Sequence, residues 1–495
     1  MAAAAGLDFG YFFRLTAASQ FGLGPGCLIV AIQACCGIVD SRRVRQSGSM
    51  FRSVSRGLIG HAFPILIAQL SSIGMMVVDT AVLGHVSSID LAAVAIGGGI
   101  HVSIVFALVG IVQAVSPVVA HLHGAGRDDE VAGVLQQGFW LAMLLAVPGI
   151  LFLTHPGAVL GMADMDAAVE AKVRQYLALL AWGLPASLFY RTFYAFCNAL
   201  GKPRVLMGIG LLSLALHALL AWGFALQGWL GEPLGVVGCA LSNILIGWLA
   251  CTSGAAYLAF GPLGPRYRPF SNWQLPNWAA WRELLRIGVP MGLSNLVEIT
   301  SFTLIALFVA SLGATVVGGH RIVANLSALI YMLPLSLGIA TMSAIGQAVG
   351  ARDGLRARVT IRAGLILAGA SSTAIGFLLW LVAEPVVAAY TDDPAVRSVA
   401  MGLIIYVAIY QFFDALQTIA GHALRAYRVT FVPMLVQIFC FWGVGLLGGA
   451  WLCYRWPTPL GVAGFWMAAA ASLLLAAAML LPLLRKVMLA TELTP

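Results

Sequence analysis

Long apolar runs follow one another along nearly the whole chain and are separated by short polar or basic stretches. Each run is about 20 residues long, the length that a transmembrane helix needs, whereas strands of a membrane β-barrel show about ten residues of alternating polarity. The pattern therefore predicts twelve transmembrane helices. They cover residues 58–83, 91–122, 138–154, 172–198, 205–226, 235–260, 284–312, 316–348, 361–383, 396–423, 431–453 and 460–484.

The composition excludes a soluble protein. Hydrophobic residues make up 61% of the 495 residues and charged residues only 9%, whereas soluble domains carry about 45–50% apolar and about 25% charged residues. Such a chain cannot cover its surface with polar groups in water. A soluble enzyme, a secreted disulfide scaffold, a disordered chain and a coiled coil are therefore excluded. The expected fold class is an all-α polytopic membrane protein.

Lysine and arginine are distributed unequally between alternate loops. With the N-terminus in the cytoplasm, most loop cations lie inside, and the outside loops carry only Lys172, Arg174, Arg397 and Arg455. Cytoplasmic loops are rich in Lys and Arg, so we expect a multi-pass protein in the lipid bilayer with both termini cytoplasmic. The net charge of +8 has the same cause, and we expect no nucleic-acid partner.

The two halves of the patterned chain resemble each other. Pro64 opens the first half and Pro290 the second, and the pairs Gly124-Ala125 and Gly350-Ala351 lie 226 residues apart. Repeats with an even number of spans have the same topology and are related by an axis along the membrane normal. We therefore expect two similar six-helix bundles around a central cleft. The predicted domains are an N-terminal lobe at 50–262, a cytoplasmic linker at 263–283, a C-terminal lobe at 284–487 and a tail at 488–495.

The first 49 residues differ from the rest. An apolar stretch at 21–39 is broken early by Gly24 and Pro25, and its arginines follow it, the reverse of the order in a signal peptide. We expect 1–49 to be a poorly ordered extension, one that can lie upstream of the true start of translation, with an additional N-terminal helix as the alternative. Deletion of residues 2–49 should leave insertion and transport close to unchanged.

Three carboxylates lie inside predicted spans: Asp79, Glu298 and Asp414. An ionisable group within hydrocarbon is a functional hypothesis by default. Ser294, four residues before Glu298, and Ser301, three residues after it, share its helix face. The structural alternative is that each carboxylate pairs with a buried cation and holds helices together. Candidate cations are Arg191, Arg321 and a histidine.

Asp414 belongs to a similar polar stripe, with Tyr410 four residues before it and Thr418 four residues after it. A carboxylate in a low-dielectric cavity is stabilised either by taking a proton or by holding a cation. Glu298 and Asp414 are therefore either reversible proton carriers or, with the Tyr410 hydroxyl, oxygen ligands of a dehydrated Na⁺. Either ion would compete with a cationic organic substrate, and such competition with alternating access is antiport.

His217 lies deep in a span of the same half as Asp79, and it is either a hydrogen-bonded core residue or part of a proton relay. The sequence holds no P-loop and no His-Glu-x-x-His motif, and its eight cysteines show no metal spacing. We therefore expect neither an enzyme nor any cofactor besides the coupling ion, Na⁺ or H⁺.

Several segments, taken together in order and spacing, resemble the multidrug and toxic compound extrusion (MATE) family, most closely its NorM-type bacterial branch. The likeness covers about residues 55–487. It rests on Pro64-Ile-Leu-Ile-Ala-Gln-Leu-Ser71 with Val78-Asp-Thr80, Ser116-Pro-Val-Val-Ala120 with Gly124-Ala-Gly-Arg127, Gly319-His-Arg-Ile322 with Asn325, Met332-Leu-Pro-Leu-Ser336 and Tyr410-Gln-Phe-Phe-Asp414.

The resemblance implies that the acids of the seventh and tenth helices, here Glu298 and Asp414, take part in cation coupling together with Tyr410. A family acid in the first helix matches Asp79. His217 stands where relatives usually carry Asn, which favours protons over sodium in that half. Among polar residues of the spans, His217, Asn325, Ser294 and Ser301 are candidates for a proton relay or for substrate contacts.

The resemblance further implies a monomeric exporter of cationic or amphipathic drugs in the bacterial inner membrane. A flippase for lipid-linked sugars, related by fold, is the alternative. A flippase is expected to need a strongly basic groove for pyrophosphate, whereas the spans here hold carboxylates and few deep Arg or Lys residues. This distribution favours cationic cargo.

Overall fold

The computed structural model describes residues 48–161, 165–271, 273–457 and 460–493. The predicted extension at 1–49, apart from its last two residues, lies outside the described residues. Those two residues begin the first long helix, and residues Met50–Pro495 form one compact unit. Throughout the described ranges the regular structure is helical, with no strands.

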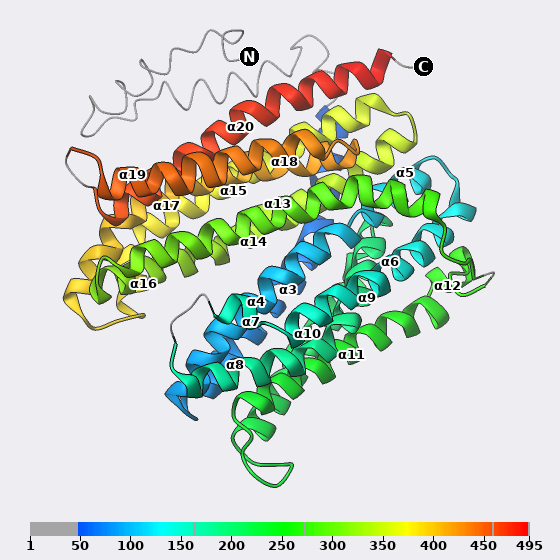
Figure 1. The fold of residues 1–495 in the computed structure, drawn as a ribbon. Helices are drawn as coiled ribbons and strands as arrows, with labels where there is room; N and C mark the ends of the chain where they lie inside the picture. Colours follow the sequence, from blue (N-terminus) through cyan, green and yellow to red (C-terminus); the bar gives the residue numbers. More distant parts are fainter. Residues whose placement is uncertain (1–47, 162–164, 272, 458–459, 494–495) are drawn as a thin grey trace. The chain divides into compact units, whose positions relative to one another are not determined.

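The first half of the chain holds the helices drawn from blue to green in Figure 1. They are α3 (Gly48–Gly84), α4 (Ser88–Val112), α5 (Val115–Gly124), α6 (Asp128–Thr154), α7 (Gly157–Leu160), α8 (Ala167–Leu180), the 3₁₀ turn η2 (Ala181–Gly183), α9 (Leu184–Ala199), α10 (Pro203–Ala225), α11 (Val236–Phe260) and α12 (Leu263–Tyr267).

The second half holds the helices drawn from green to red. They are α13 (Trp278–Ala310), α14 (Ala314–Gly350), α15 (Gly354–Leu381), α16 (Ala383–Ala388), α17 (Pro394–Ala426), α18 (Phe431–Gln437), the π-helix η3 (Ile438–Gly448), α19 (Gly449–Tyr454) and α20 (Val462–Leu493).

Among the described residues, 11 helical segments are long and apolar enough to cross a membrane, and each overlaps a predicted span. The remaining predicted span, 172–198, is formed by α8 and α9. These helices have 14 and 16 residues and meet at the 3₁₀ turn η2. Each piece alone is therefore shorter than a span. The prediction of an all-α polytopic membrane protein is confirmed.

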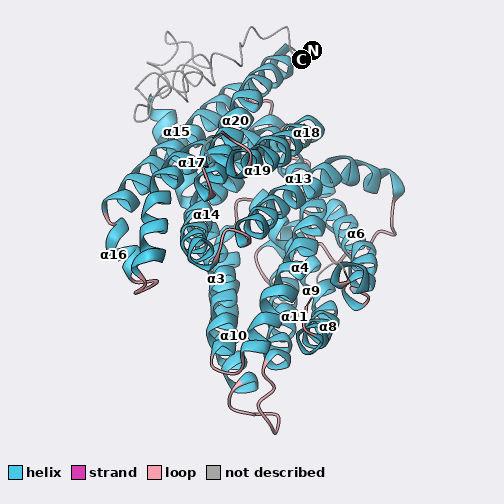
Figure 2. Ribbon diagram, turned by 60° about the vertical axis from the view of Figure 1, so that its left-hand side comes forward, coloured by secondary structure: helices cyan, strands magenta, loops and turns pink. Residues whose placement is uncertain are grey.

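The helices gather into two bundles, the first from α3–α11 and the second from α13–α20 (Figure 2). Within the first, α4 packs on α8 and α10 packs on α11; within the second, α17 packs on α14, α15 and α20. The two bundles meet mainly where α13 runs along α4 and α14 runs along α5. We call this contact the seam.

Glycines allow the seam helices to approach closely. A Cβ added to Gly124 would overlap the backbone carbonyl of Gln347, and one added to Gly350 would overlap that of His121. Gly350 follows Gly124 by 226 residues, and Gln347 follows His121 by the same number, so each half makes the same contact on the other. Gly110 and Gly292 meet backbone to backbone farther along the seam.

Hydrogen bonds across the seam are also exchanged between the halves. The Gln347 Nε2 donates to the carbonyl of Ala199, the last residue of α9, at 2.7 Å. The His121 Nε2 donates to the carbonyl of Ala426, the last residue of α17, at 2.7 Å. Helix C-termini leave carbonyls without an intrahelical partner. Each lobe therefore caps a helix of the other.

The eleventh span departs from regular α-helix, which the sequence did not predict. Residues 438–448 form a π-helix of 11 residues, in which the backbone hydrogen bonds join residues five apart. The Ser301 hydroxyl of α13 donates to the Phe441 carbonyl at 3.2 Å. The Trp442 indole donates to the Thr300 hydroxyl at 3.3 Å. These bonds attach α13 to η3.

Candidate functional site

An acidic cluster lies inside the second bundle, between α13, α14 and α17. Glu298 lies on α13, and Tyr410 and Asp414 lie one turn apart on α17. The two carboxylates are close enough to repel each other electrostatically, and the Tyr410 hydroxyl is close to both. The structure therefore brings together the three residues that the sequence singled out in this half.

Neutral donors surround the two acids. The Gln417 Nε2 donates to the Asp414 Oδ1 at 3.0 Å, and the Tyr331 hydroxyl of α14 lies near the Glu298 carboxylate. Asp414 is only 3% exposed, whereas Glu298 is partly accessible. Burial of a charge is costly unless the charge is compensated. Two neighbouring acids in this position are therefore stabilised by any positive charge close to them.

Arg425 and Asn295 belong to the surroundings of this cluster and were not predicted. The Arg425 guanidinium of α17 interacts electrostatically with Glu298, and its Nη2 lies 3.5 Å from the Asn295 Oδ1. Asn295 stands three residues before Glu298 on α13, so their side chains share a face. Asn295 could have been predicted from its spacing to Glu298 on the helix. Arg425 lies near the end of its predicted span, where an arginine is common, so the sequence did not single it out.

A second polar centre lies inside the first bundle, between α3, α10 and α11. The His217 Nε2 is 3.0 Å from the Asp79 Oδ1, and the Ser242 hydroxyl is 3.0 Å from the His217 Nδ1. The Asn243 Nδ2 donates to the other carboxylate oxygen of Asp79 at 2.9 Å. Both oxygens of Asp79 therefore have an N–H donor.

Burial sets this chain of polar groups apart from solvent. His217 and Ser242 are fully buried, and Asp79 is 6% exposed. The sequence indicated Asp79 and His217 separately and left open whether they interact. It gave no reason to select Ser242 and Asn243, because serine and asparagine are common in membrane helices and their partners lie on other spans.

No hydrogen bond is seen between the remaining candidates and the acids of these two centres within the described ranges. Asn325 is exposed on α14, Ser294 is buried on α13, and the Ser301 hydroxyl is used by the Phe441 carbonyl. Arg191 stands over the Tyr194 ring at 5.6 Å, and Arg321 is exposed. In the described ranges neither arginine pairs with a carboxylate of either centre.

The acidic cluster offers two carboxylates and a phenol hydroxyl as oxygen ligands. No group of three or more His, Cys, Asp or Glu side chains among the described residues could hold a metal ion. A sodium ion between Glu298 and Asp414 would need further oxygens from the Tyr410 hydroxyl or from amides.

Two helical membrane bundles with matching contacts, each enclosing a buried acidic centre, define a transporter built on a duplicated bundle. The MatE family model matches residues 64–222 and 290–451. The chain therefore belongs to the MATE family, as its motifs indicated.

Curated relatives and solved structures agree with this assignment. A probable multidrug resistance protein NorM of Aromatoleum aromaticum is 51% identical over 440 residues, which are 88% of this chain and 95% of the relative. A multidrug resistance protein NorM of Aliivibrio fischeri is 34% identical over 412 residues, 83% of this chain and 89% of the relative.

The fold itself matches solved MATE structures. The eukaryotic MATE transporter AtDTX14 superposes with a TM-score of 0.80 at 18% identity, covering 89% of this chain and 99% of that chain. A multidrug resistance MATE family transporter in an outward-facing conformation gives a TM-score of 0.81 at 18% identity, covering 89% and 97%. The predicted family and fold are confirmed.

Proposed function

We propose that the chain is a secondary active multidrug exporter that exchanges H⁺ or Na⁺ for cationic amphipathic drugs by alternating access. It works as a monomer in the bacterial inner membrane, with both termini in the cytoplasm. The observation that carries the proposal is the acid pair Glu298 and Asp414 beside Tyr410 in the second bundle. The names of the NorM relatives support drugs as the cargo.

The acid pair supplies the competition that antiport needs. Two close carboxylates hold one positive charge well, because that charge relieves their mutual repulsion. A cationic drug and the coupling ion would use the same negative charge and would exclude each other. Arg425 beside Glu298 limits how much positive charge the cluster accepts. Exchange of one cation for another follows from this balance.

The centre around Asp79 is suited to a proton rather than to sodium. Both Asp79 oxygens already accept hydrogen bonds, which leaves few lone pairs for a metal ion. When His217 is neutral, the Ser242 hydroxyl donates to its Nδ1. When His217 is protonated, Nδ1 donates to the Ser242 hydroxyl oxygen. The Ser242 hydroxyl then donates to the His217 backbone carbonyl, which lies 3.3 Å away. Every group thus keeps a partner in both protonation states.

The test is ethidium export from vesicles in which Na⁺ and H⁺ gradients are imposed separately. Glu298→Gln and Asp414→Asn remove charge while keeping shape, so each should assemble normally and lose uphill export by at least tenfold. Asp129→Asn, an exposed acid at the start of α6, is the matched control and should export as the parent does. Full gradient-driven export by the Glu298→Gln, Asp414→Asn double variant would refute the assignment.

A further inference from the structure

Two adjoining hollows lie where α13 begins and α18 begins, at the end of the molecule that carries the basic loops. The first, of about 780 Å³, lies around residues 278–286, the first turns of α13. The second, of about 560 Å³, lies between α13 and residues 428–432. Glu283 and Arg286 line both, so the two hollows adjoin, and we call them together the α13 groove.

The α13 groove carries an excess of positive charge. Three arginines line it, Arg282, Arg286 and Arg428, against the single acid Glu283. The Arg428 Nη1 donates to the Glu283 Oε1 at 2.6 Å, so this pair is neutral. Arg282 and Arg286 are exposed, and neither has an ion-pair partner in the part of the chain that the structure describes. Two guanidinium groups are therefore left for an external anion.

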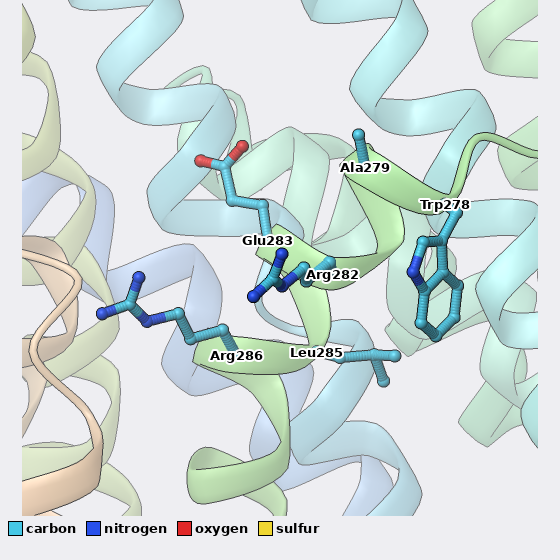
Figure 3. Close-up of a pocket in the computed structure, with 6 residues that line it drawn as sticks. All are labelled: Trp278, Ala279, Arg282, Glu283, Leu285 and Arg286. Atoms are coloured by element: carbon cyan, nitrogen blue, oxygen red, sulfur yellow. The ribbon is translucent and has the colours of Figure 1, made fainter.

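The two free guanidinium groups are arranged to share one anion. Arg282 and Arg286 are four residues apart on α13, and Figure 3 shows their side chains extending in the same direction from successive turns. Side chains at this spacing are neighbours on a helix surface. Arginine presents several N–H donors in a planar fork that matches phosphate oxygens.

The flanks of the groove are apolar, which selects the kind of anion. Trp278 is 69% exposed at the start of α13, and Phe431 is 60% exposed at the start of α18. Beyond Phe431, Leu435 and Phe439 are 47% and 54% exposed along the same span. Tryptophan is enriched where a membrane protein meets the headgroup level. An anion with an attached acyl chain would satisfy both the arginines and this apolar strip.

We infer that the α13 groove binds the phosphate headgroup of an anionic phospholipid, with its acyl chains along α18 and η3. Arg282 and Arg286 hold the phosphate oxygens, and Trp278 lies at the level of the glycerol. Basic pockets between helices at a membrane surface bind such headgroups. The site is separate from both acidic centres, so it does not depend on the proposed coupling chemistry.

The experiment is native mass spectrometry of the full-length protein in detergent, titrated with phosphatidylglycerol, with phosphatidylcholine or with inorganic phosphate. The parent should retain phosphatidylglycerol in preference to phosphatidylcholine, and phosphate at the same concentration should not displace it. Arg282→Gln and Arg286→Gln should each weaken retention about fivefold, the effect of one basic residue at a membrane surface.

Arg127→Gln is the control. Arg127 lies in the loop before α6 and pairs with Glu130, so its substitution removes one arginine charge outside the groove and should leave lipid retention unchanged. Equal retention of both lipids, or unchanged retention by the Arg282→Gln, Arg286→Gln double variant, would overturn the site. Displacement by inorganic phosphate would show that a free anion, not a lipid, is the ligand.

Discussion

Gly350→Ala tests whether the seam is the contact that closes one end of the transporter. A Cβ at position 350 would overlap the His121 carbonyl oxygen and lie 2.8 Å from its carbonyl carbon. Carbon atoms prefer to be about 3.5–4.0 Å apart, so α14 and α5 must separate by about 1 Å. The obstacle is rigid backbone in the opposite lobe, so a side-chain rotation cannot relieve it.

The size of the effect follows from the two bonds that such a separation breaks. The His121–Ala426 and Gln347–Ala199 hydrogen bonds are both 2.7 Å long and span the seam. Each contributes about 1 kcal/mol net, so losing both disfavours the closed seam by about 2 kcal/mol, or roughly 30-fold in population. Within each lobe the packing is unchanged, so folding should be retained.

Thiol labelling measures this shift. Ser343 is 1% exposed and donates to the Asn198 carbonyl across the seam, so a cysteine placed there is shielded while the seam is closed. Labelling of Ser343→Cys by a maleimide should be roughly 30-fold faster with Gly350→Ala than without it. Gly402→Ala is the control, since an added Cβ there meets no atom within 4 Å. Labelling within twofold of that control would refute the role given to the seam.

Two further predictions concern the proton site and the repeat. His217→Asn keeps a hydrogen-bond donor for Asp79 but removes the imidazole ring. Ethidium export driven by H⁺ should therefore fall at least tenfold, while export driven by Na⁺ persists. Equal loss under both gradients would instead indicate a structural role for His217. Arg352 has a left-handed backbone (φ 56°) where its counterpart is Gly126 (φ 72°). Arg352→Gly should therefore raise the free energy of unfolding by about 0.5–1 kcal/mol, after subtraction of the conformational entropy that glycine adds to the unfolded chain. Thermal unfolding measures this change. Arg352→Ala keeps the backbone strain and should show no gain.

The spans and the intramembrane acids could be predicted because each has a signal in the local sequence. An apolar run of sufficient length forms a helix in a bilayer whatever it packs against, and a carboxylate such as Asp414 within a run is conspicuous on its own. The irregular fourth span was also predicted by hydropathy, although α8 and α9 are separate helices there. Signals of this kind do not depend on how the helices are arranged in the fold.

What the sequence did not disclose depends on contacts between distant spans. Ser242 and Asn243 matter only because α11 brings them against His217 and Asp79. In the sequence Arg425 cannot be distinguished from nearby loop arginines, and only the position of α17 in the fold shows that it interacts with Glu298. The exchange of helix caps across the seam likewise requires both lobes in place, since His121 and Ala426 are remote in sequence. Hydrogen-bond partners of common polar residues cannot be assigned from one helix alone.

The seam and the acidic cluster are built on the same helices. Gly292 of α13 contacts the other lobe six residues before Glu298, about 9 Å along a helix. On α17, Asp414 lies in the same helix whose last carbonyl, at Ala426, is capped by His121. Packed helices move as units because interiors are too dense to deform locally. Under the proposed function, a cation that draws the Glu298 and Asp414 carboxylates together would reposition two helices that also form the seam, so the occupancy of the cluster and the closure of the seam would change together.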